Sequence, residues 1–148
     1  MILELIEPDK IMKVKSCTRE LDRAQLSGIL NENMRHYNGV GLSANQLGIF
    51  ERAFVMVSNM ETDETIVCFN PQITKCYKNM DLMEEGCLSF PDVNLNVIRY
   101  CSIIVKYEDE CKKVHKKKLT GFPARIFQHE YDHMEGINFT QRSYDSVQ

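Results

Sequence analysis

The sequence lacks any long apolar segment. No run of roughly 18 or more apolar residues, the length that a membrane-spanning helix needs, occurs anywhere in the chain. Charged residues recur from Glu4 to Glu20, so this region cannot supply the apolar core of a signal peptide. We therefore expect no membrane association and a cytoplasmic protein.

Paired cysteines and a strong excess of one charge are also missing. The six cysteines form no C-x-x-C pair, and in a cytosolic protein most cysteines are reduced and buried as small apolar residues. The net charge of −3 gives no overall attraction to nucleic acid or to an anionic membrane. No direct role on nucleic acid is expected from these numbers.

The sequence also lacks repeats, low-complexity tracts and linkers. Its 148 residues, 43% hydrophobic and 26% charged, are typical of one globular domain. We predict a single domain spanning residues 1–148.

Periodicity and turn residues predict two helices around a β-rich middle. The first helix is expected from Thr18, as N-cap, to about Tyr37, and the second from Leu119–Pro123 to just before Gly136. In the second helix Thr120 or Gly121 can serve as the cap, and Pro123 suits the first turn. The expected strands are Ala53–Val57, Thr65–Phe69, Val97–Tyr107 and Cys111–Leu119, the last two forming a hairpin around the acidic turn 108–110.

The second helix contains the pattern H-E-x-x-H. His129 and His133 are four residues apart, so on a helix both imidazoles lie on one face and can bind one metal ion. Glu130 follows the first histidine, where it can accept a proton from a water molecule that the metal activates. Without further context, two ordinary surface histidines would be the alternative.

A third metal ligand is expected upstream, because a catalytic site commonly uses three protein ligands and leaves one position open. Cys87, within Glu85–Ser89, is the natural candidate, since a cation strongly stabilises a thiolate. Taken alone, Cys87 would be interpreted as a buried core thiol.

The segment 39–48 is rich in glycine and contains Gln46. Its closely spaced glycines permit a close backbone approach, and the Gln46 amide can donate to a developing oxyanion. By itself such a segment would be an ordinary loop.

Together, the segments 39–48, 85–89 and 128–136 resemble the peptide deformylase family in order and spacing, over roughly residues 2–139. The residues just before the histidines, Gly121–Phe127, are similar to organellar and bacteriophage-encoded members. The resemblance implies an α+β fold, with antiparallel β-sheets packed around the central H-E-x-x-H helix and an N-terminal helix. If a virus encodes the chain, its location would be the host cytoplasm.

The resemblance implies a metal-dependent hydrolase that removes the formyl group from the N-terminal formyl-methionine of new polypeptides. Cys87, His129 and His133 would bind the metal, and Glu130 would be the general base. The Gln46 side chain and the Leu88 backbone N–H would stabilise the oxyanion. The family generally works best with Fe²⁺, whereas this ligand set also suits Zn²⁺, Ni²⁺ or Co²⁺.

Substrate contacts are expected around the same segments. The methionine pocket would use Phe122, Ile126 and the stem of Arg125, and the backbone of Val40-Gly41 and Gly86 would pair with an extended peptide. Asp132 and Arg99 are candidates to orient the histidines, with a surface charge and a structural ion pair as the respective alternatives.

Two features depart from the family pattern. Asn38 stands where many members have Glu beside an arginine matching Arg99, so one supporting ion pair is expected to be absent. The sequence also stops about where many members begin a C-terminal helix, which contributes to ribosome attachment in some of them. We expect this helix to be lacking, and docking on the ribosome stays open.

One run of basic residues, Lys112–Lys118, remains outside these motifs. It fits a solvated edge strand whose lysines discourage pairing with other chains. The alternative is a patch that faces RNA.

Two other functions remain open at this point. A different H-E-x-x-H amidase or peptidase would share the helix, although zincin-type enzymes take their third ligand downstream of it. A non-catalytic module stabilised by a metal would not need Glu130.

Overall fold

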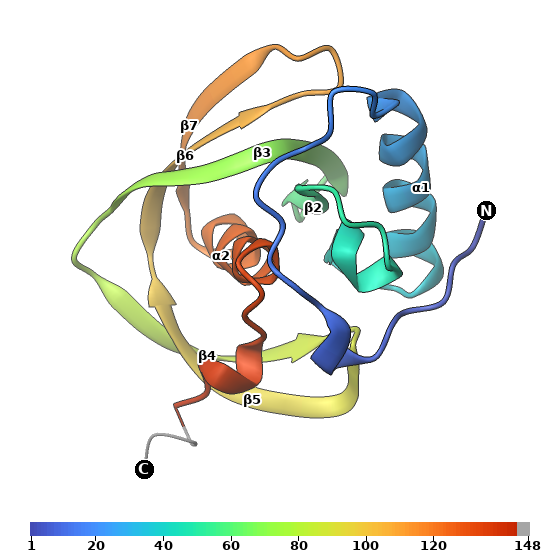
Figure 1. Ribbon diagram of the computed structural model, residues 1–148. Coiled ribbons are helices and arrows are strands. Elements are labelled where there is room, and N and C mark those ends of the chain that lie inside the picture. Colours follow the sequence, from blue (N-terminus) through green and yellow to red (C-terminus); the bar gives the residue numbers. More distant parts are fainter. Residues whose placement is uncertain (145–148) are drawn as a thin grey trace.

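The structure, a computed structural model, describes residues 1–144 (Figure 1). Its elements in chain order, with η for a 3-10 helix, are η1 (Pro8–Lys10), α1 (Arg23–His36), β1 (Gly41–Ser43), η2 (Ala44–Leu47), β2 (Ala53–Asn59), β3 (Glu64–Cys76), β4 (Met80–Cys87), β5 (Phe90–Tyr100), β6 (Ser102–Glu108), β7 (Val114–Thr120), α2 (Phe122–Met134) and η3 (Phe139–Gln141).

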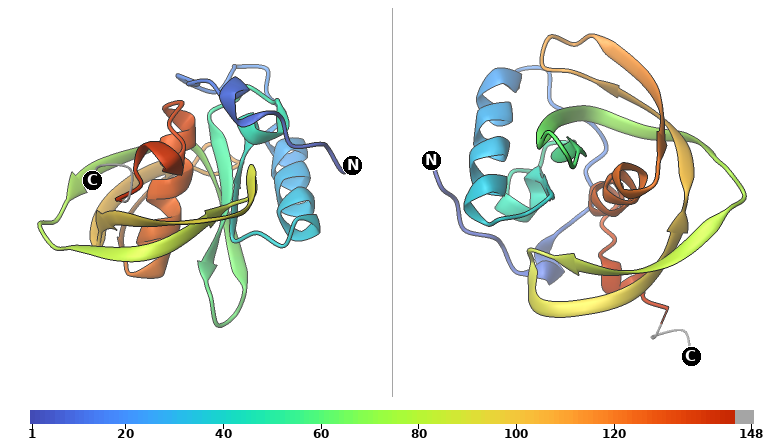
Figure 2. Two further views of the ribbon diagram at one scale, coloured as in Figure 1. Left: turned by 90° about the horizontal axis from the view of Figure 1, so that it is seen from below. Right: turned by 180° about the vertical axis from the view of Figure 1, so that it is seen from behind.

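Strand β2 lies between the two α-helices, as Figure 2 shows. Its apolar run is buried on both faces because successive side chains alternate. Ala53, Val55 and Val57 pack in the core under α1, whereas Phe54 and Met56 pack in the core under α2. One strand therefore joins two hydrophobic clusters.

The strands form two antiparallel sheets around α2. The larger sheet has the order β1-β2-β3-β6-β7, and the smaller sheet pairs β4 with β5. In Figure 1, α2 lies at the centre, with the larger sheet curving over it and the smaller sheet below. The predicted α+β architecture around a central H-E-x-x-H helix is confirmed.

Helix α1 begins later than predicted. Asp22 is the N-cap and accepts a hydrogen bond from the Gln25 N–H at 3.0 Å. The prediction of Thr18 as the N-cap is wrong. Its hydroxyl instead donates a hydrogen bond to the Glu51 carboxylate at 2.6 Å. The helix ends at His36, and Asn38 adopts the left-handed conformation with φ 58°.

The predicted strand Val97–Tyr107 is two strands. The chain changes sheets at Cys101, so β5 pairs with β4 and β6 pairs with β3 and β7. The partner of β5, strand β4, was not predicted, because it carries no run of β-branched residues and its outward side chains Met80, Leu82 and Glu84 are exposed.

The predicted hairpin is confirmed as β6–β7, with Glu108 opposite Val114. Its turn needs no glycine because Asp109 organises it. The Asp109 carboxylate accepts from the backbone N–H groups of Cys111 (2.8 Å) and Lys113 (3.0 Å), and Lys112 takes the positive φ of 66°.

Helix α2 has the predicted bounds. Gly121 occupies the N-cap with φ 72°, and Pro123 lies in the first turn. Thr120 is the last residue of β7 and does not cap the helix. Past the helix, Gly136 has φ 74° and its N–H donates to the His133 carbonyl.

Within residues 1–144, no helix combines the length and apolar character needed to cross a membrane. The expected lack of a further C-terminal helix falls partly on residues 145–148, which lie outside the described residues. The last described element is η3.

Candidate metal centre

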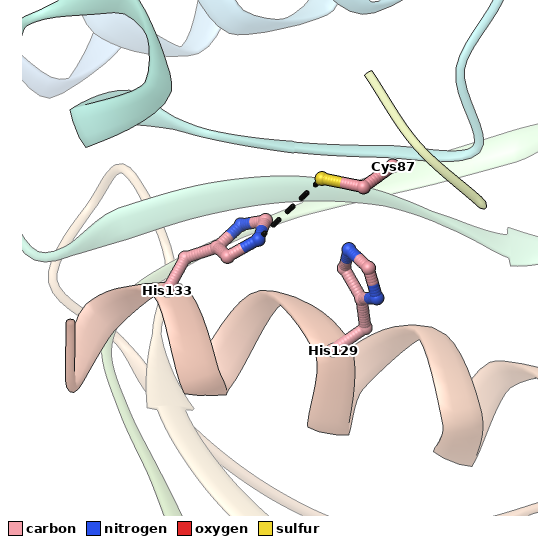
Figure 3. Close-up of side chains that lie close together, drawn as sticks. All are labelled: Cys87, His129 and His133. Carbon is pink, nitrogen blue, oxygen red and sulfur yellow. Dashed lines mark hydrogen bonds between the residues drawn. The ribbon is translucent and has the colours of Figure 1, made fainter. Parts of the chain in front are cut away.

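The three predicted metal ligands lie together. His129 and His133 project from one face of α2 toward Cys87, as Figure 3 shows. Cys87 Sγ lies 3.8 Å from His133 Nε2, and the donor atoms of all three residues lie within 4.8 Å of one another. Both histidines are buried.

Cys87 reaches this position through an irregularity in the smaller sheet. The pairing of β4 with β5 shifts between Gly86 and Cys87, so that Cys87 pairs with Phe90 across a tight connection. Burial opposes ionisation of the thiol, but His129 and His133 outweigh it and lower the pKa of Cys87 from 9.0 to about 6. The two histidines therefore favour the thiolate form of Cys87.

One thiolate and two imidazoles fit a divalent transition metal ion. Ligand atoms at ~2.0–2.3 Å from one ion lie ~3.3–3.8 Å apart in a tetrahedral site. The Cys87–His133 separation agrees with that spacing, and the 4.8 Å limit on the whole group places all three donors within reach of a single ion.

Glu85 holds the ring of His129, a role that the sequence did not reveal. Glu85 Oε1 lies 2.9 Å from His129 Nδ1, which leaves Nε2 as the nitrogen available to a metal. Arg99 binds the same carboxylate through two hydrogen bonds of 2.8 and 3.0 Å, and Arg125 donates to it as well. Burial opposes the charge, but His129 and Arg99 lower the pKa of Glu85 to about 2.

Arg99 links the Glu85 carboxylate to Asp132. Arg99 Nη1 donates to Asp132 Oδ2 at 2.7 Å, and Arg142 contacts Asp132 from the rim. Among the hydrogen bonds of residues 1–144, neither Arg99 nor Asp132 contacts a histidine ring directly. Arg99 reaches His129 through Glu85, and it has two carboxylate partners although Asn38 stands in place of a glutamate.

His133 is held from the other side of the site. Its Nδ1 lies 3.0 Å from Glu130 Oε1 and 3.1 Å from Ser43 Oγ. Asn45 Nδ2 donates to the His133 carbonyl at 2.7 Å. Residues 43–45, which precede β2, are therefore hydrogen-bonded directly to α2.

The side-chain amide of Gln46 has a fixed orientation. Its oxygen accepts from the backbone N–H of Ser43 at 3.0 Å, and its nitrogen donates to Ser89 Oγ at 2.9 Å. The same nitrogen lies 3.7 Å from Cys87 Sγ. An N–H donor thus faces the ligand cluster, and Ser43 and Ser89, which the sequence motifs contain without an assigned role, keep it there.

Two glycines make room for site residues. A Cβ added at Gly41 would lie 2.6 Å from Glu130 Oε2, and one added at Gly39 would lie 2.7 Å from Leu88 Cδ1. At Gly41, the missing side chain lets Glu130, the general-base candidate, contact the backbone of β1. At Gly39, it lets Leu88 contact the backbone just before β1.

The cluster opens into a cavity of about 640 Å³. Its walls include the catalytic candidates Gln46, Leu88 and Glu130, together with the predicted substrate-binding residues Val40, Gly41, Gly86, Phe122, Arg125 and Ile126. The guanidinium of Arg125 is turned toward Glu85 and Asp81, so it is already paired. Phe90, Pro91 and Val93 from β5 add an apolar wall that the sequence did not predict.

Known proteins with a similar sequence identify the family to which this arrangement of residues belongs. A family model described as polypeptide deformylase matches residues 6–148. The chain belongs to this family. It is 38% identical over 138 residues to peptide deformylase 2 of Prochlorococcus marinus, which covers 92% of the chain and 66% of that protein.

A peptide deformylase of Thermotoga neapolitana is 40% identical over 112 residues, 75% of the chain and 66% of that protein. The chain thus spans slightly less than two thirds of the length of these curated relatives.

Solved deformylase structures share the fold over nearly their whole length. A class I type b peptide deformylase of Acinetobacter baumannii superposes with a TM-score of 0.87 at 33% identity, covering 96% of this chain and 99% of that one. A probable peptide deformylase of Synechococcus phage S-SSM7 gives 0.83 at 36% identity, covering 95% and 99%. The second likeness agrees with the predicted similarity to bacteriophage-encoded members.

Proposed function

We propose that this protein is a peptide deformylase, which hydrolyses the N-formyl group of formyl-methionyl polypeptides to formate and a free amine. The observation that carries this proposal is the Cys87–His129–His133 cluster, with Glu130 beside it at the wall of one cavity. One of the similar Acinetobacter structures is bound to Met-Ala-Ser, a peptide of the form that such a reaction releases.

Cys87, His129 and His133 would hold one divalent ion, with Fe²⁺ as the proposed native metal and Zn²⁺, Ni²⁺ or Co²⁺ as substitutes. When bound, this ion supplies Lewis-acid activation of water and of the formyl oxygen. Glu85 supports the site by keeping His129 in the orientation described above.

Glu130 is the proposed general base. Its carboxylate is buried, is hydrogen-bonded to His133 Nδ1 and faces Gly41, so it is fixed at the cavity wall. In this position it takes a proton from the attacking water and returns it to the leaving amine.

Gln46 and Leu88 are the proposed oxyanion donors. The Gln46 amide nitrogen already points toward Cys87, and the Leu88 backbone N–H follows that residue directly. Such preoriented N–H groups stabilise a negative charge that develops on the formyl oxygen.

The substrate would enter as an extended strand. β1 is the edge strand of the larger sheet, and β4 has one unpaired side because the smaller sheet has two strands. The backbone of Val40-Gly41 and of Gly86 lines the cavity between them, which fits pairing with a peptide from both sides. Phe122, Ile126 and the stem of Arg125 would receive the methionine side chain.

The proposed substrates are new polypeptides that still carry formyl-methionine, and the proposed place of the reaction is the cytoplasm, where these chains are made. The decisive experiment is anaerobic purification with metal analysis, followed by a formate-release assay on formyl-Met-Ala-Ser. Acetyl-Met-Ala-Ser and unformylated Met-Ala-Ser are the matched controls.

Formate release from the formyl peptide alone is the expected result. Cleavage of a peptide bond in the unformylated control would favour a zincin-type peptidase instead. Bound metal without release from any of the three peptides would favour a non-catalytic metal-stabilised module.

A further inference from the structure

The outer side of the larger sheet carries a group of basic residues that do not line the cavity of the metal site. On β6, Ile103, Val105 and Tyr107 point inward and are buried in the cluster under α2. Because side chains alternate along a strand, Ile104 and Lys106 point outward. The pairing register places Lys116 opposite Lys106, Lys118 opposite Ile104, and Lys75 of β3 opposite Ile104 from the other side.

We call Lys75, Tyr77, Lys106, Lys116 and Lys118 the outer basic face. Its four lysines are exposed and spread over three neighbouring strands, which lie about 4.8 Å apart in a sheet. Among the ion pairs of residues 1–144, none involves these four ammonium groups. The face therefore presents uncompensated positive charge although the whole chain has a net charge of −3.

Protection of a sheet edge accounts for only part of this face. Lysines on β7 discourage pairing with other chains, because β7 is an edge strand. Lys106 lies on β6, which pairs with β3 on one side and with β7 on the other, and it needs no such protection. Lys75 lies in residues 70–76 of β3, which pair with β6 alone, so edge protection also accounts for this lysine. Lys106 also lies directly opposite Lys116, a like-charge pair that destabilises a sheet unless an anion lies between the two.

Two of the three acidic residues at the β6–β7 turn are paired elsewhere, and the third, Glu110, is exposed and has no ion pair among residues 1–144. In the β6–β7 turn, Asp109 pairs with His115 at 2.8 Å, and Glu108 pairs with Arg23 at 2.9 Å. Neither carboxylate is available to neutralise the lysines of the face. An external anion is therefore the partner that this charge distribution fits.

An aromatic ring lies among these charges. The ammonium groups of Lys75 and Lys118 each lie 4.6 Å from the centroid of the Tyr77 ring. Cations and aromatic rings arranged together on a sheet surface are the combination with which proteins bind single-stranded nucleic acid. Regularly spaced lysines match the repeating phosphates of such a strand better than they match a single small anion.

We propose that the outer basic face binds the phosphodiester backbone of single-stranded RNA. The choice of RNA over DNA rests on the proposed function, because polypeptide synthesis takes place on RNA. The face lies on the side of the larger sheet turned away from α2 (Figure 1). None of its residues lines the substrate cavity, so a bound strand leaves that cavity open.

The test is fluorescence anisotropy with a labelled oligouridylate of about twelve nucleotides, titrated with the metal-loaded protein at several salt concentrations. The test variant is Lys106→Gln/Lys118→Gln. The control is Lys10→Gln/Lys117→Gln, which removes the same charge. Lys117 is on β7 like Lys118, but its ammonium group reaches the ring of the inward Tyr107, 5.6 Å from the centroid.

At ~0.1 M salt the test variant is expected to bind the oligonucleotide roughly tenfold or more weakly than the wild type, and its salt slope is expected to fall by roughly 1.4, the loss of two contacts. The control should retain most of the affinity. Both double variants should release formate from formyl-Met-Ala-Ser at the wild-type rate, which separates this proposal from the proposed function.

Equal weakening by the two double variants would overturn the proposal, because it would show a response to net charge alone. No binding by the wild type at low salt would also overturn it. Tighter binding to oligothymidylate than to oligouridylate would reject RNA as the partner. Binding to vesicles that contain anionic lipid, without binding to the oligonucleotide, would assign the face to a membrane surface.

Discussion

The two sides of helix α2 are both buried, but different forces hold them. On one side Ala124, Phe127 and Met134 pack in an apolar cluster with β2 and β6, and Phe127 meets Phe54 edge-to-face at 5.0 Å. On the other side Arg125, His129 and Asp132 belong to a network of charged groups, each no more than 8% exposed.

Removing these charges from water is costly, so the polar side contributes less to stability than an apolar core of equal size. The cost is limited because the charges alternate: Glu85 lies between Arg99 and Arg125, and Asp132 lies beside Arg99. The apolar side therefore stabilises the helix, and the polar side orients the residues that perform the chemistry.

Glu85→Gln is expected to have the largest effect, because Glu85 both pairs with buried arginines and orients the metal ligand His129. Two buried arginines lose a charged partner, which costs about 3–5 kcal/mol in the free energy of unfolding. Metal affinity is expected to fall about 10–100-fold, because His129 loses its carboxylate. Urea unfolding and a metal titration measure the two effects.

Glu84→Gln is the matched control for this prediction. Glu84 is the preceding residue on β4, and its side chain is exposed. Its replacement should change the free energy of unfolding by less than about 0.5 kcal/mol. Equal behaviour of the two variants would show that the buried network does not support the metal site.

Phe127→Ala tests the apolar side alone. Removal of this fully buried ring is expected to cost about 3–5 kcal/mol in the free energy of unfolding. Metal content and formate release per folded molecule should stay at the wild-type level. Phe127→Leu should lower the free energy of unfolding by less, because leucine retains more of the buried volume.

Loss of metal from either Phe127 variant would show that the apolar and polar sides of α2 are not independent.

Gly41→Ala tests the close contact between β1 and Glu130. The added methyl would lie 2.6 Å from Glu130 Oε2, so the carboxylate must move. We expect kcat to fall on the order of 100-fold while the metal stays bound, since small displacements of a catalytic group have effects of this size. Gly28→Ala, where nothing lies within 4 Å, is the control; a normal kcat in the Gly41 variant would contradict the proposed position of Glu130.

Ile126→Val should have the smallest effect on activity and stability. Ile126 lies between the apolar side and the polar side of α2. Ile126 lines the cavity and also packs in the cluster under α2. We expect KM for formyl-Met-Ala-Ser to rise a few-fold, with kcat unchanged and a stability cost of about 0.5–1.5 kcal/mol. Ile103→Val, the same change in the core away from the cavity, should alter stability without altering KM, and identical KM values would remove Ile126 from the methionine pocket.

The local part of the site could be predicted from the sequence. The spacing of His129 and His133 is a property of one helix, and Gly121, Pro123 and Gly136 mark its ends. Cys87 could be added because a metal needs a third ligand and the motif around this residue resembles a known family. The resemblance also led to the α+β fold, which the solved structures confirm.

The missing parts depend on contacts between distant segments. The partners of Glu85 come from β5 and α2, so no spacing around Glu85 could reveal its role. The change of sheet at Cys101 follows from tertiary packing, and a continuous β-prone run contains no sign of it. The late start of α1 is similar, because Glu51 captures Thr18 from a segment far along the chain.

On the polar side of α2, Glu130 is proposed to move the proton in a catalytic metal centre. Metal content and formate release from formyl-Met-Ala-Ser, compared between the wild type and Glu130→Gln, test this role. We predict equal metal content and a kcat that falls about 10²–10⁴-fold, the contribution of a general base. A kcat per bound metal ion equal to that of the wild type would contradict this role.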